Sequence, residues 1–258
     1  MTQALRAVDL GGLEPAAALA HDEALGRDAD RPPTLLMWRA LRPAVVIGRF
    51  QRADWEVDPL ACAKRGVGVW RRFTGGGAVY LDAGTLCITL AVPPEHPWSQ
   101  RGVPEMYLPL LDGVVRACRL RGVEAERDER TVRLGGRKVT GIAAHRGRGG
   151  MLVHGTLLID ADLDALRSCL AGPRGGEVGD APRPAPSRPD HVVNVGGDGW
   201  EEATTEAFAA EPGVLEPREA DAAAALREQK YHDPAWHAGP WSHLTPPAVR
   251  ELLGATSG

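Results

Sequence analysis

The lysine in GGRKVTGIAA (residues 135–144) is the first side chain whose type suggests chemistry. The chain has 30 Lys and Arg residues, and all of them except Lys64, Lys138 and Lys230 are arginine. A compact ammonium approaches a reacting group as a point charge, whereas a guanidinium presents a broad planar fork. Lys138 therefore indicates a charge placed for chemistry, or else a chance exception in an arginine-rich chain.

Three consecutive glycines form the second informative segment. They lie within RRFTGGGAVY (residues 71–80), between two expected strands, where backbone N–H groups without Cβ shielding can converge on an anion. Arg71 and Arg72, just upstream, would add charge-assisted contacts to that anion. A flexible hairpin turn with solvated arginines is the alternative. A P-loop is excluded, because no GK[ST] sequence and no helix start follow.

Short apolar runs separated by turn residues predict the strands that carry both segments. Each group is expected to form a meander in which consecutive strands pair through a turn, the first at 67–73, 78–82 and 85–92 and the second at 131–134, 137–146 and 151–160. Two further strands are expected at 34–41 and 44–50. Apolar residues at helical spacing predict helices at 14–27, 58–67, 104–121, 162–171, 200–211 and 216–230, with Asp58 as an N-cap. Strands and helices do not alternate strictly, which favours an α+β fold.

Composition limits the classes of function. With 258 residues, 43% hydrophobic and 25% charged, the chain can form one large globular domain. A net charge of −4 gives no basic footprint, so we expect no nucleic-acid partner. The four cysteines form no metal-ligand cluster and are typical of reduced, buried thiols. No segment has signal-peptide or transmembrane character, so the expected location is cytoplasmic, with no membrane association.

Two segments carry a family resemblance. RRFTGGGAVYLDAGTLCITL (71–90) and GGRKVTGIAAHRGRGGMLVHGTLLID (135–160) resemble the signatures of the lipoate-protein ligase A family. This family belongs to the biotin/lipoate protein ligase catalytic-domain superfamily, which also includes octanoyltransferases. ALAHDEAL, AVVIGRFQ and EQKYHDPAW fit in order, so that the likeness spans residues 14–240.

The resemblance implies an α+β catalytic domain over residues 1–242, with a mixed, largely antiparallel sheet flanked by helices. A long Gly/Pro-rich loop at 172–199 would be a lid that orders over the bound adenylate. Residues 243–258 would be a tail. The chain ends where many such ligases carry a C-terminal accessory domain, which some relatives supply as a separate polypeptide partner.

The resemblance also implies a two-step reaction. The lipoate carboxylate attacks the α-phosphate of ATP to give lipoyl-adenylate and pyrophosphate. A lysine of an acceptor domain then takes the lipoyl group as an amide. The acceptor would be a 2-oxoacid dehydrogenase subunit or the glycine-cleavage H protein. ATP chemistry of this kind normally uses Mg²⁺.

Carried over position by position, the resemblance assigns the site residues. Lys138 would be the catalytic cation, in contact with the lipoate carboxylate and the α-phosphate. Residues expected to bind ATP and the adenylate are Arg72, Gly75, Gly76, Gly77, Ala78, Val79 and Tyr80, together with Lys138. Those expected to bind lipoate are Lys138, Gly141, His154, Gly155 and Thr156. Asp82 is a candidate Mg²⁺ ligand or a turn-stabilising residue, and Leu41, Val46 and Val79 are candidate walls of an acyl tunnel.

Two positions depart from the family pattern and leave alternatives open. Leu81 stands where the family usually has His, and Thr85 where it usually has Asn, which puts ATP use in question. An octanoyltransferase acting through a cysteine thioester is one alternative. No cysteine lies just ahead of Lys138, and Cys169 is the best remaining candidate nucleophile. A non-catalytic protein that binds lipoate or lipoyl domains is the other alternative.

Overall fold

A six-stranded sheet forms the centre of the computed structural model, which describes residues 4–103, 105–170 and 191–239. Its strand order is β10-β11-β6-β2-β1-β12. The strands are β1 (Arg6–Leu13), β2 (Thr34–Ala40), β6 (Thr85–Val92), β10 (Thr140–Gly147), β11 (Gly150–Leu158) and β12 (Glu211–Pro212). The pairs from β10 to β2 are antiparallel, while β1 pairs parallel with β2 and β12. The predicted mixed, largely antiparallel sheet is confirmed.

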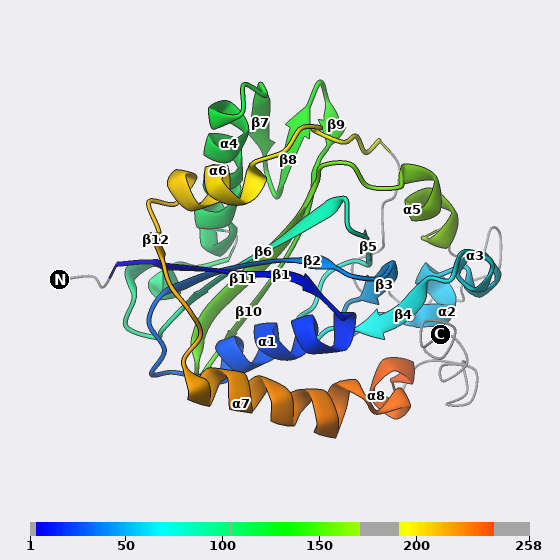
Figure 1. Ribbon diagram of the computed structural model, residues 1–258, viewed down its shortest axis with the longest axis horizontal. Coiled ribbons are helices and arrows are strands. Elements are labelled where there is room, and N and C mark those ends of the chain that lie inside the picture. The colour runs from blue at the N-terminus through cyan, green and yellow to red at the C-terminus, as the bar shows by residue number, and fades with distance from the viewer. Residues whose placement is uncertain (1–3, 104, 171–190, 240–258) are drawn as a thin grey trace.

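Helices cover both faces of this sheet (Figure 1). On one face lie α1 (Pro15–Arg27) and α7 (Pro217–Leu226), and on the other α4 (Leu108–Leu120) and α6 (Trp200–Ala207). Side chains alternate along a strand, so β2 directs Leu36 and Trp38 toward the α1 side, and Leu35 and Met37 toward the α4 side. Every residue of β6 is buried, because both of its faces are covered.

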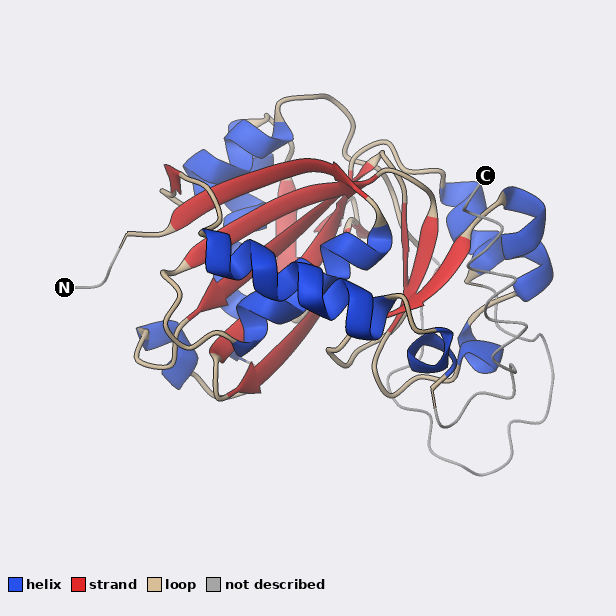
Figure 2. Ribbon diagram, turned by 60° about the horizontal axis from the view of Figure 1, so that its bottom comes forward, coloured by secondary structure: helices blue, strands red, loops and turns tan. Residues whose placement is uncertain are grey.

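A three-stranded sheet lies beside the main one (Figure 2). In it, β3 (Ala44–Ile47) pairs in parallel with β4 (Gly68–Arg71) and antiparallel with β5 (Val79–Leu81). The expected strand–turn–strand pairing of β4 with β5 was wrong, because both strands flank β3. Residues 72–78, which contain the glycine triplet, therefore form a loop that crosses over β3 from β4 to β5 and not a hairpin turn. We call this segment the crossing loop. Around this sheet pack α2 (Ala53–Glu56), α3 (Pro59–Arg65) and α5 (Leu163–Cys169).

The strand expected at 137–146 is split between two sheets. Arg137–Lys138 form β9, which pairs with β8 (Thr131–Leu134) next to β7 (Ala125–Asp128). The chain changes sheets at Val139, which is fully buried and hydrogen-bonded to Val132 on one side and Leu158 on the other. Lys138 is held by backbone hydrogen bonds to His191 and Val193, at 2.7 and 3.0 Å. The position of Lys138 is thus fixed by backbone on both sides.

The remaining predicted helices form close to their expected bounds. Asp58 caps α3 by accepting the Ala61 N–H at 2.9 Å, as predicted. A 3₁₀ turn, η2 (Glu105–Tyr107), precedes α4, and another, η1 (Pro97–Gln100), lies before it. After α7 come the π-helical turn η3 (Arg227–Tyr231) and α8 (Pro234–Ala238). No helix in the described ranges is long and apolar enough to cross a membrane. Residues 172–190 of the expected lid loop, and the tail 243–258, lie outside the described residues.

Candidate active site

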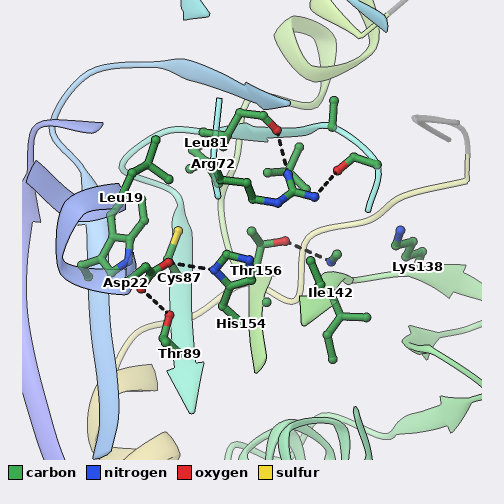
Figure 3. Close-up of a pocket in the computed structure, with 18 residues that line it drawn as sticks. Leu19, Asp22, Arg72, Leu81, Cys87, Thr89, Lys138, Ile142, His154 and Thr156 are labelled. Carbon is green, nitrogen blue, oxygen red and sulfur yellow. Dashed lines mark hydrogen bonds and ion pairs between the residues drawn. The ribbon is translucent and has the colours of Figure 1, made fainter. Parts of the chain in front are cut away.

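One cavity brings together most of the predicted site residues (Figure 3). It lies between α1, β5, β6, β10, β11 and the crossing loop. Of the predicted residues, those that line it are Arg72, Gly77, Ala78, Val79, Lys138, Gly141, His154, Gly155 and Thr156. Gly75, Gly76, Tyr80 and Asp82 are outside the lining. Residues that the sequence interpretation did not assign also line it, namely Leu19, Asp22, Trp38, Cys87, Thr89, Ile142 and Ala143.

The cavity has two chemically different ends. Figure 3 shows Lys138 far from Leu19 and Cys87, on the opposite side of the cavity. The end that contains Leu19 and Cys87 is lined by the further apolar side chains of Trp38 and Leu81, together with Asp22 and Thr89, whose polar groups are bonded to each other. Val46 and Val79 line the cavity as expected, but Leu41 does not, because its side chain is 61% exposed. An elongated apolar ligand with a negatively charged head matches this polarity.

The crossing loop is held from inside by Arg72. Its guanidinium donates hydrogen bonds to the carbonyls of Gly75 (2.5 Å), Gly77 (2.8 Å) and Val46 (3.0 Å), and to the Thr74 hydroxyl (2.9 Å). Burial lowers the pKa of Arg72 to about 10, so it stays charged at neutral pH. The guanidinium thus holds the carbonyls of the loop, and Arg72 also lines the cavity, so its contact with an anion stays a prediction.

Arg71 also points away from the cavity. Its guanidinium donates to the carbonyls of Gly48, Arg49 and Gln51 on one side. On the other side it bonds the carbonyls of residues 236–238, in and beside α8. The expected anion contact from Arg71 was thus wrong, because the side chain ties the C-terminal helices to the segment after β3.

Two glycines are needed by close contacts in the crossing loop. Gly76 has a φ of +88°, a conformation that residues with a Cβ rarely adopt. A Cβ on Gly48 would lie 2.1 Å from the Gly76 carbonyl oxygen. Side chains at these positions would displace the loop and the N–H groups that it presents.

His154 lies in the middle of the site with both ring nitrogens engaged. Its Nδ1 is 2.8 Å from the Asp22 carboxylate, and its Nε2 is 2.7 Å from the Thr74 hydroxyl. Asp22 accepts a second hydrogen bond from the Thr89 hydroxyl at 2.7 Å. Asp22 was missed because a carboxylate in a helical sequence normally indicates an exposed face. The one available signal was its place within ALAHDEAL, among apolar helix positions.

Thr156 and Gly141 face each other on β11 and β10. The Gly141 N–H donates to the Thr156 hydroxyl oxygen at 3.0 Å, which leaves the hydroxyl proton of Thr156 available to an acceptor in the cavity. A Cβ on Gly141 would lie 2.9 Å from Val79. Gly141 therefore allows β10 to approach β5 closely beside Lys138.

Lys138 also borders a second, smaller hollow. That hollow is lined by residues of β5, β11 and α5, and by Val192 of the segment that pairs with β9. It shares Lys138, Gly141 and Thr156 with the main cavity. The ammonium thus lies where two binding spaces meet, which suits a reaction between two ligands.

Asp82 is a turn residue and does not fit a metal site. One of its carboxylate oxygens accepts the Gly84 N–H and the Thr85 hydroxyl, and the other accepts the Asp162 N–H. The described residues contain no group of three or more His, Cys, Asp or Glu side chains placed to hold a metal. Thr85, one of the two departures from the family pattern, therefore stabilises this turn, whereas Leu81, the other, is a buried wall of the cavity.

All four cysteines are buried. Cys87 is the one that lines the main cavity, at the apolar end, where burial and the Asp22 carboxylate raise the pKa of its thiol. Cys118 lies in the core on the α4 side, and burial raises the pKa of its thiol to about 11. A hydrogen bond with Cys62 lowers the pKa of Cys169, and the same bond, with burial, raises that of Cys62. Cys169 is fully buried on α5 and lines neither hollow.

Comparison with known proteins identifies the family. Residues 14–210 match the model of the lipoyl protein ligase A/B catalytic domain. The chain belongs to this family. The predicted resemblance is thereby confirmed, and so is its general consequence that the chain is an enzyme of the lipoate ligase and octanoyltransferase family.

The curated relatives include both octanoyltransferases and lipoate-protein ligases. An octanoyltransferase, LipM of Kyrpidia tusciae, is 32% identical over 243 residues, covering 80% of this chain and 87% of its own. Lipoate-protein ligase A subunit 1 of Thermoplasma acidophilum is also 32% identical, over 170 residues, covering 60% of this chain and 63% of its own.

Solved structures of lipoate ligases share the fold. A lipoate-protein ligase A bound with ATP superposes with a TM-score of 0.76 at 27% identity, covering 93% of this chain and 99% of that one. A structure from a structural analysis of a bi-partite lipoate protein ligase and its E2 lipoyl domain from Thermoplasma acidophilum gives a TM-score of 0.75 at 26% identity, covering 93% of this chain and 97% of that one.

Proposed function

We propose that this protein is a lipoate-protein ligase. It forms lipoyl-adenylate from lipoate and ATP with release of pyrophosphate, and transfers the lipoyl group to a lysine amine of an acceptor domain. The observation that carries the proposal is the composition of the cationic end of the cavity. Lys138, Thr156 and the crossing loop meet at this end, and none of the four cysteines lies there.

The two-ended cavity suits the first step. The hydrocarbon part of lipoate fits the end lined by Leu19, Trp38 and Cys87, which places its carboxylate at the end with Lys138. Gly77 and Ala78 of the crossing loop also line the cavity, and backbone N–H groups of such a loop would suit a phosphate. Mg²⁺ would enter with ATP, since Asp82 is occupied by the turn it stabilises.

Both steps develop negative charge close to the ammonium of Lys138. In the first step the charge appears on the oxygens of the pentavalent phosphorus. In the second it appears on the carbonyl oxygen of the tetrahedral intermediate, which forms when the acceptor amine attacks the adenylate and collapses when AMP leaves with the bonding electrons. A fixed cation stabilises both, and loss of one such group typically costs about 10²–10³ in rate. The Thr156 hydroxyl is placed to donate to the same oxygens.

The partners that we propose are a lipoyl-acceptor domain and a separate accessory polypeptide. A Thermoplasma relative is named as subunit 1 of a lipoate-protein ligase, and a similar solved structure from the same species is described as a bi-partite lipoate protein ligase with an E2 lipoyl domain of its own. A 2-oxoacid dehydrogenase subunit or the glycine-cleavage H protein would be the acceptor in this case.

Octanoyl transfer from acyl carrier protein is the second candidate. The likeness to LipM octanoyltransferases favours it. It requires a thiolate that attacks the octanoyl thioester, expels the carrier thiol and holds the octanoyl group before an acceptor lysine takes it. Cys169 has the more acidic thiol of its pair with Cys62, but it lines neither hollow.

One assay separates the candidates. Apo-acceptor is incubated with the protein in two tubes, one with lipoate, ATP and Mg²⁺, the other with octanoyl-carrier protein and no ATP. The acceptor is then weighed by mass spectrometry. A lipoyl mass in the first tube supports the ligase, and an octanoyl mass in the second tube alone overturns it. No modification in either tube, with or without an accessory polypeptide, indicates a protein that binds without catalysis.

A further inference from the structure

A continuous row of hydrogen bonds connects a buried carboxylate on α1 to the crossing loop. Asp22 is 2% exposed, and its two oxygens accept from the Thr89 hydroxyl and from His154 Nδ1. From His154 the row continues through Nε2 to the Thr74 hydroxyl, which also accepts from Arg72 Nε. Arg72 in turn holds the carbonyls of the loop. The row joins α1, β11 and the crossing loop at the wall of the cavity. Figure 3 shows its bonds from Asp22 to His154 and to Thr89.

For a neutral imidazole, the donors and acceptors of this row agree in only one direction. An ionised carboxylate can only accept, so a neutral His154 carries its proton on Nδ1 and presents a lone pair at Nε2. The Thr74 oxygen receives the Arg72 N–H, and its own proton is donated to that lone pair. In the opposite imidazole tautomer, a lone pair on Nδ1 would face the Asp22 carboxylate at 2.8 Å.

The arrangement resembles a hydroxyl–imidazole–carboxylate triad, but its geometry does not suit a nucleophile. Thr74 is 1% exposed and does not line the cavity, so an acyl group in the cavity cannot reach its oxygen. That oxygen also accepts from the buried Arg72 guanidinium. The row therefore fixes positions and is not attacked by substrate.

We propose that Asp22 is a positioning residue for acyl transfer. It holds His154 in one tautomer and, through Thr74 and Arg72, fixes the crossing loop opposite Lys138. Its carboxylate does not touch the reacting atoms. Its effect reaches them because the loop carbonyls bound by Arg72 determine where the neighbouring N–H groups point. The proposal rests on the proposed function only for its catalytic consequence.

Asp22→Asn tests this role, since it keeps the size of the side chain and adds an amide donor. We expect kcat to fall about 10- to 100-fold, by analogy with the range seen at metal sites when the hydrogen-bond partner that orients a ligating histidine is lost. The KM for the acyl substrate should change much less, because the apolar wall is intact. Glu219→Gln is the matched control, since Glu219 is another buried carboxylate, bonded to Arg6 and remote from the cavity, and it should leave kcat unchanged.

A spectroscopic readout distinguishes positioning from general stability. Nitrogen-15 NMR of the imidazoles, with the His154 signals assigned from a His154→Gln variant, should show the Nδ1–H tautomer in the wild type and the Nε2–H tautomer in Asp22→Asn. Thr89→Val removes the other bond to the carboxylate and should keep the Nδ1–H tautomer. Combining Asp22→Asn with Thr74→Val should give less than the sum of the two kcat losses, because both break one row.

Three outcomes would each overturn the proposal. The first is an unchanged His154 tautomer in Asp22→Asn, the second is a kcat of Asp22→Asn equal to that of the wild type, and the third is additive losses of kcat in the double variant. The NMR measurement requires no turnover. A wild-type protein that is inactive with both acyl donors would therefore contradict the proposed function, while the tautomer would still decide whether Asp22 orients His154.

Discussion

At the scale of single residues, Lys138 is the most direct test of the proposed chemistry. Lys138→Arg keeps the charge, but a planar guanidinium cannot occupy the same small space between two hollows. We expect adenylate formation, measured as pyrophosphate release, to fall about 10²- to 10³-fold. Lys64→Arg, on the exposed side of α3, is the control and should have no effect. Full pyrophosphate release by Lys138→Arg would remove this residue from the mechanism.

Cys87 tests the orientation of the acyl chain. Because it lies at the end of the cavity away from Lys138, Cys87→Met should shorten the space for the chain. We expect kcat/KM for an eight-carbon acid to fall about 10-fold relative to a six-carbon acid, since one methylene in such a pocket is worth about 1–3 kcal/mol. Cys87→Ala should retain activity with the eight-carbon acid. Its inactivity would point instead to a thioester on Cys87.

Single residues also show how far the sequence could lead. Lys138, His154, Thr156 and Gly77 were predicted from motifs and lie on one cavity. The direction of a buried guanidinium is not written in the sequence, because it depends on carbonyls of distant segments. For this reason Arg72 was predicted as a ligand of ATP and is found bonded to its own loop.

At the scale of elements, the C-terminal helices are tied to the site by buried polar contacts. His237 of α8 accepts the Arg71 backbone N–H at Nδ1 and lies 2.9 Å from the Tyr231 carbonyl at Nε2. Burial lowers the pKa of His237 to about 4. The neutral imidazole is therefore the form that the fold requires, as donor and acceptor at once.

This contact predicts acid sensitivity. The unfolded chain binds a proton on this histidine below its ordinary pKa of about 6.5, whereas the folded chain does so only near 4. The contribution of neutral His237 to the free energy of unfolding is therefore fully present above pH 6.5, and it is lost as the pH falls toward 4. Between pH 7 and 4.5 it amounts to about 2–3 kcal/mol of unfolding free energy.

Urea unfolding of His237→Gln at both pH values checks this. The variant should be less stable than the wild type at pH 7 and should lose less stability on acidification. His232→Gln, at a half-exposed position that pairs with Glu228, is the control. If wild type and His237→Gln show the same pH dependence, the buried imidazole does not determine it.

Element types were predicted well, but strand pairing was predicted only in part: β8 with β9 and β10 with β11 pair as expected, whereas β4 and β5 do not. The helices and most strands follow from hydrophobic periodicity, which depends on local burial. Strand pairing depends on distant segments, so RKVTGIAAHR read as one strand although it contributes to two sheets. For the same reason, the sequence predicts a turn between paired strands where the structure has the crossing loop.

At the scale of the whole molecule, the cavity brings residues of two sheets and of α1 together with Lys138. The apolar end lies against α1 and the main sheet, whereas the loop belongs to the sheet beside it. An acyl-adenylate would contact both parts at once. Separate lipoate and ATP would each contact mainly one part, so the joined product should bind more tightly than either reactant.

Thermal unfolding with ligands tests this coupling. Lipoate and ATP together should raise Tm more than the sum of their separate effects, because adenylate forms in the cavity and remains bound. If the adenylate is present at about 100 times its Kd, the stabilisation is about 2.7 kcal/mol. For a chain of this size that corresponds to roughly 5–10 °C. An ATP analogue with a methylene group between the α- and β-phosphorus cannot release pyrophosphate, and with lipoate it should give only an additive shift. Equal shifts with ATP and with this analogue would show that no adenylate forms, which would favour octanoyl transfer.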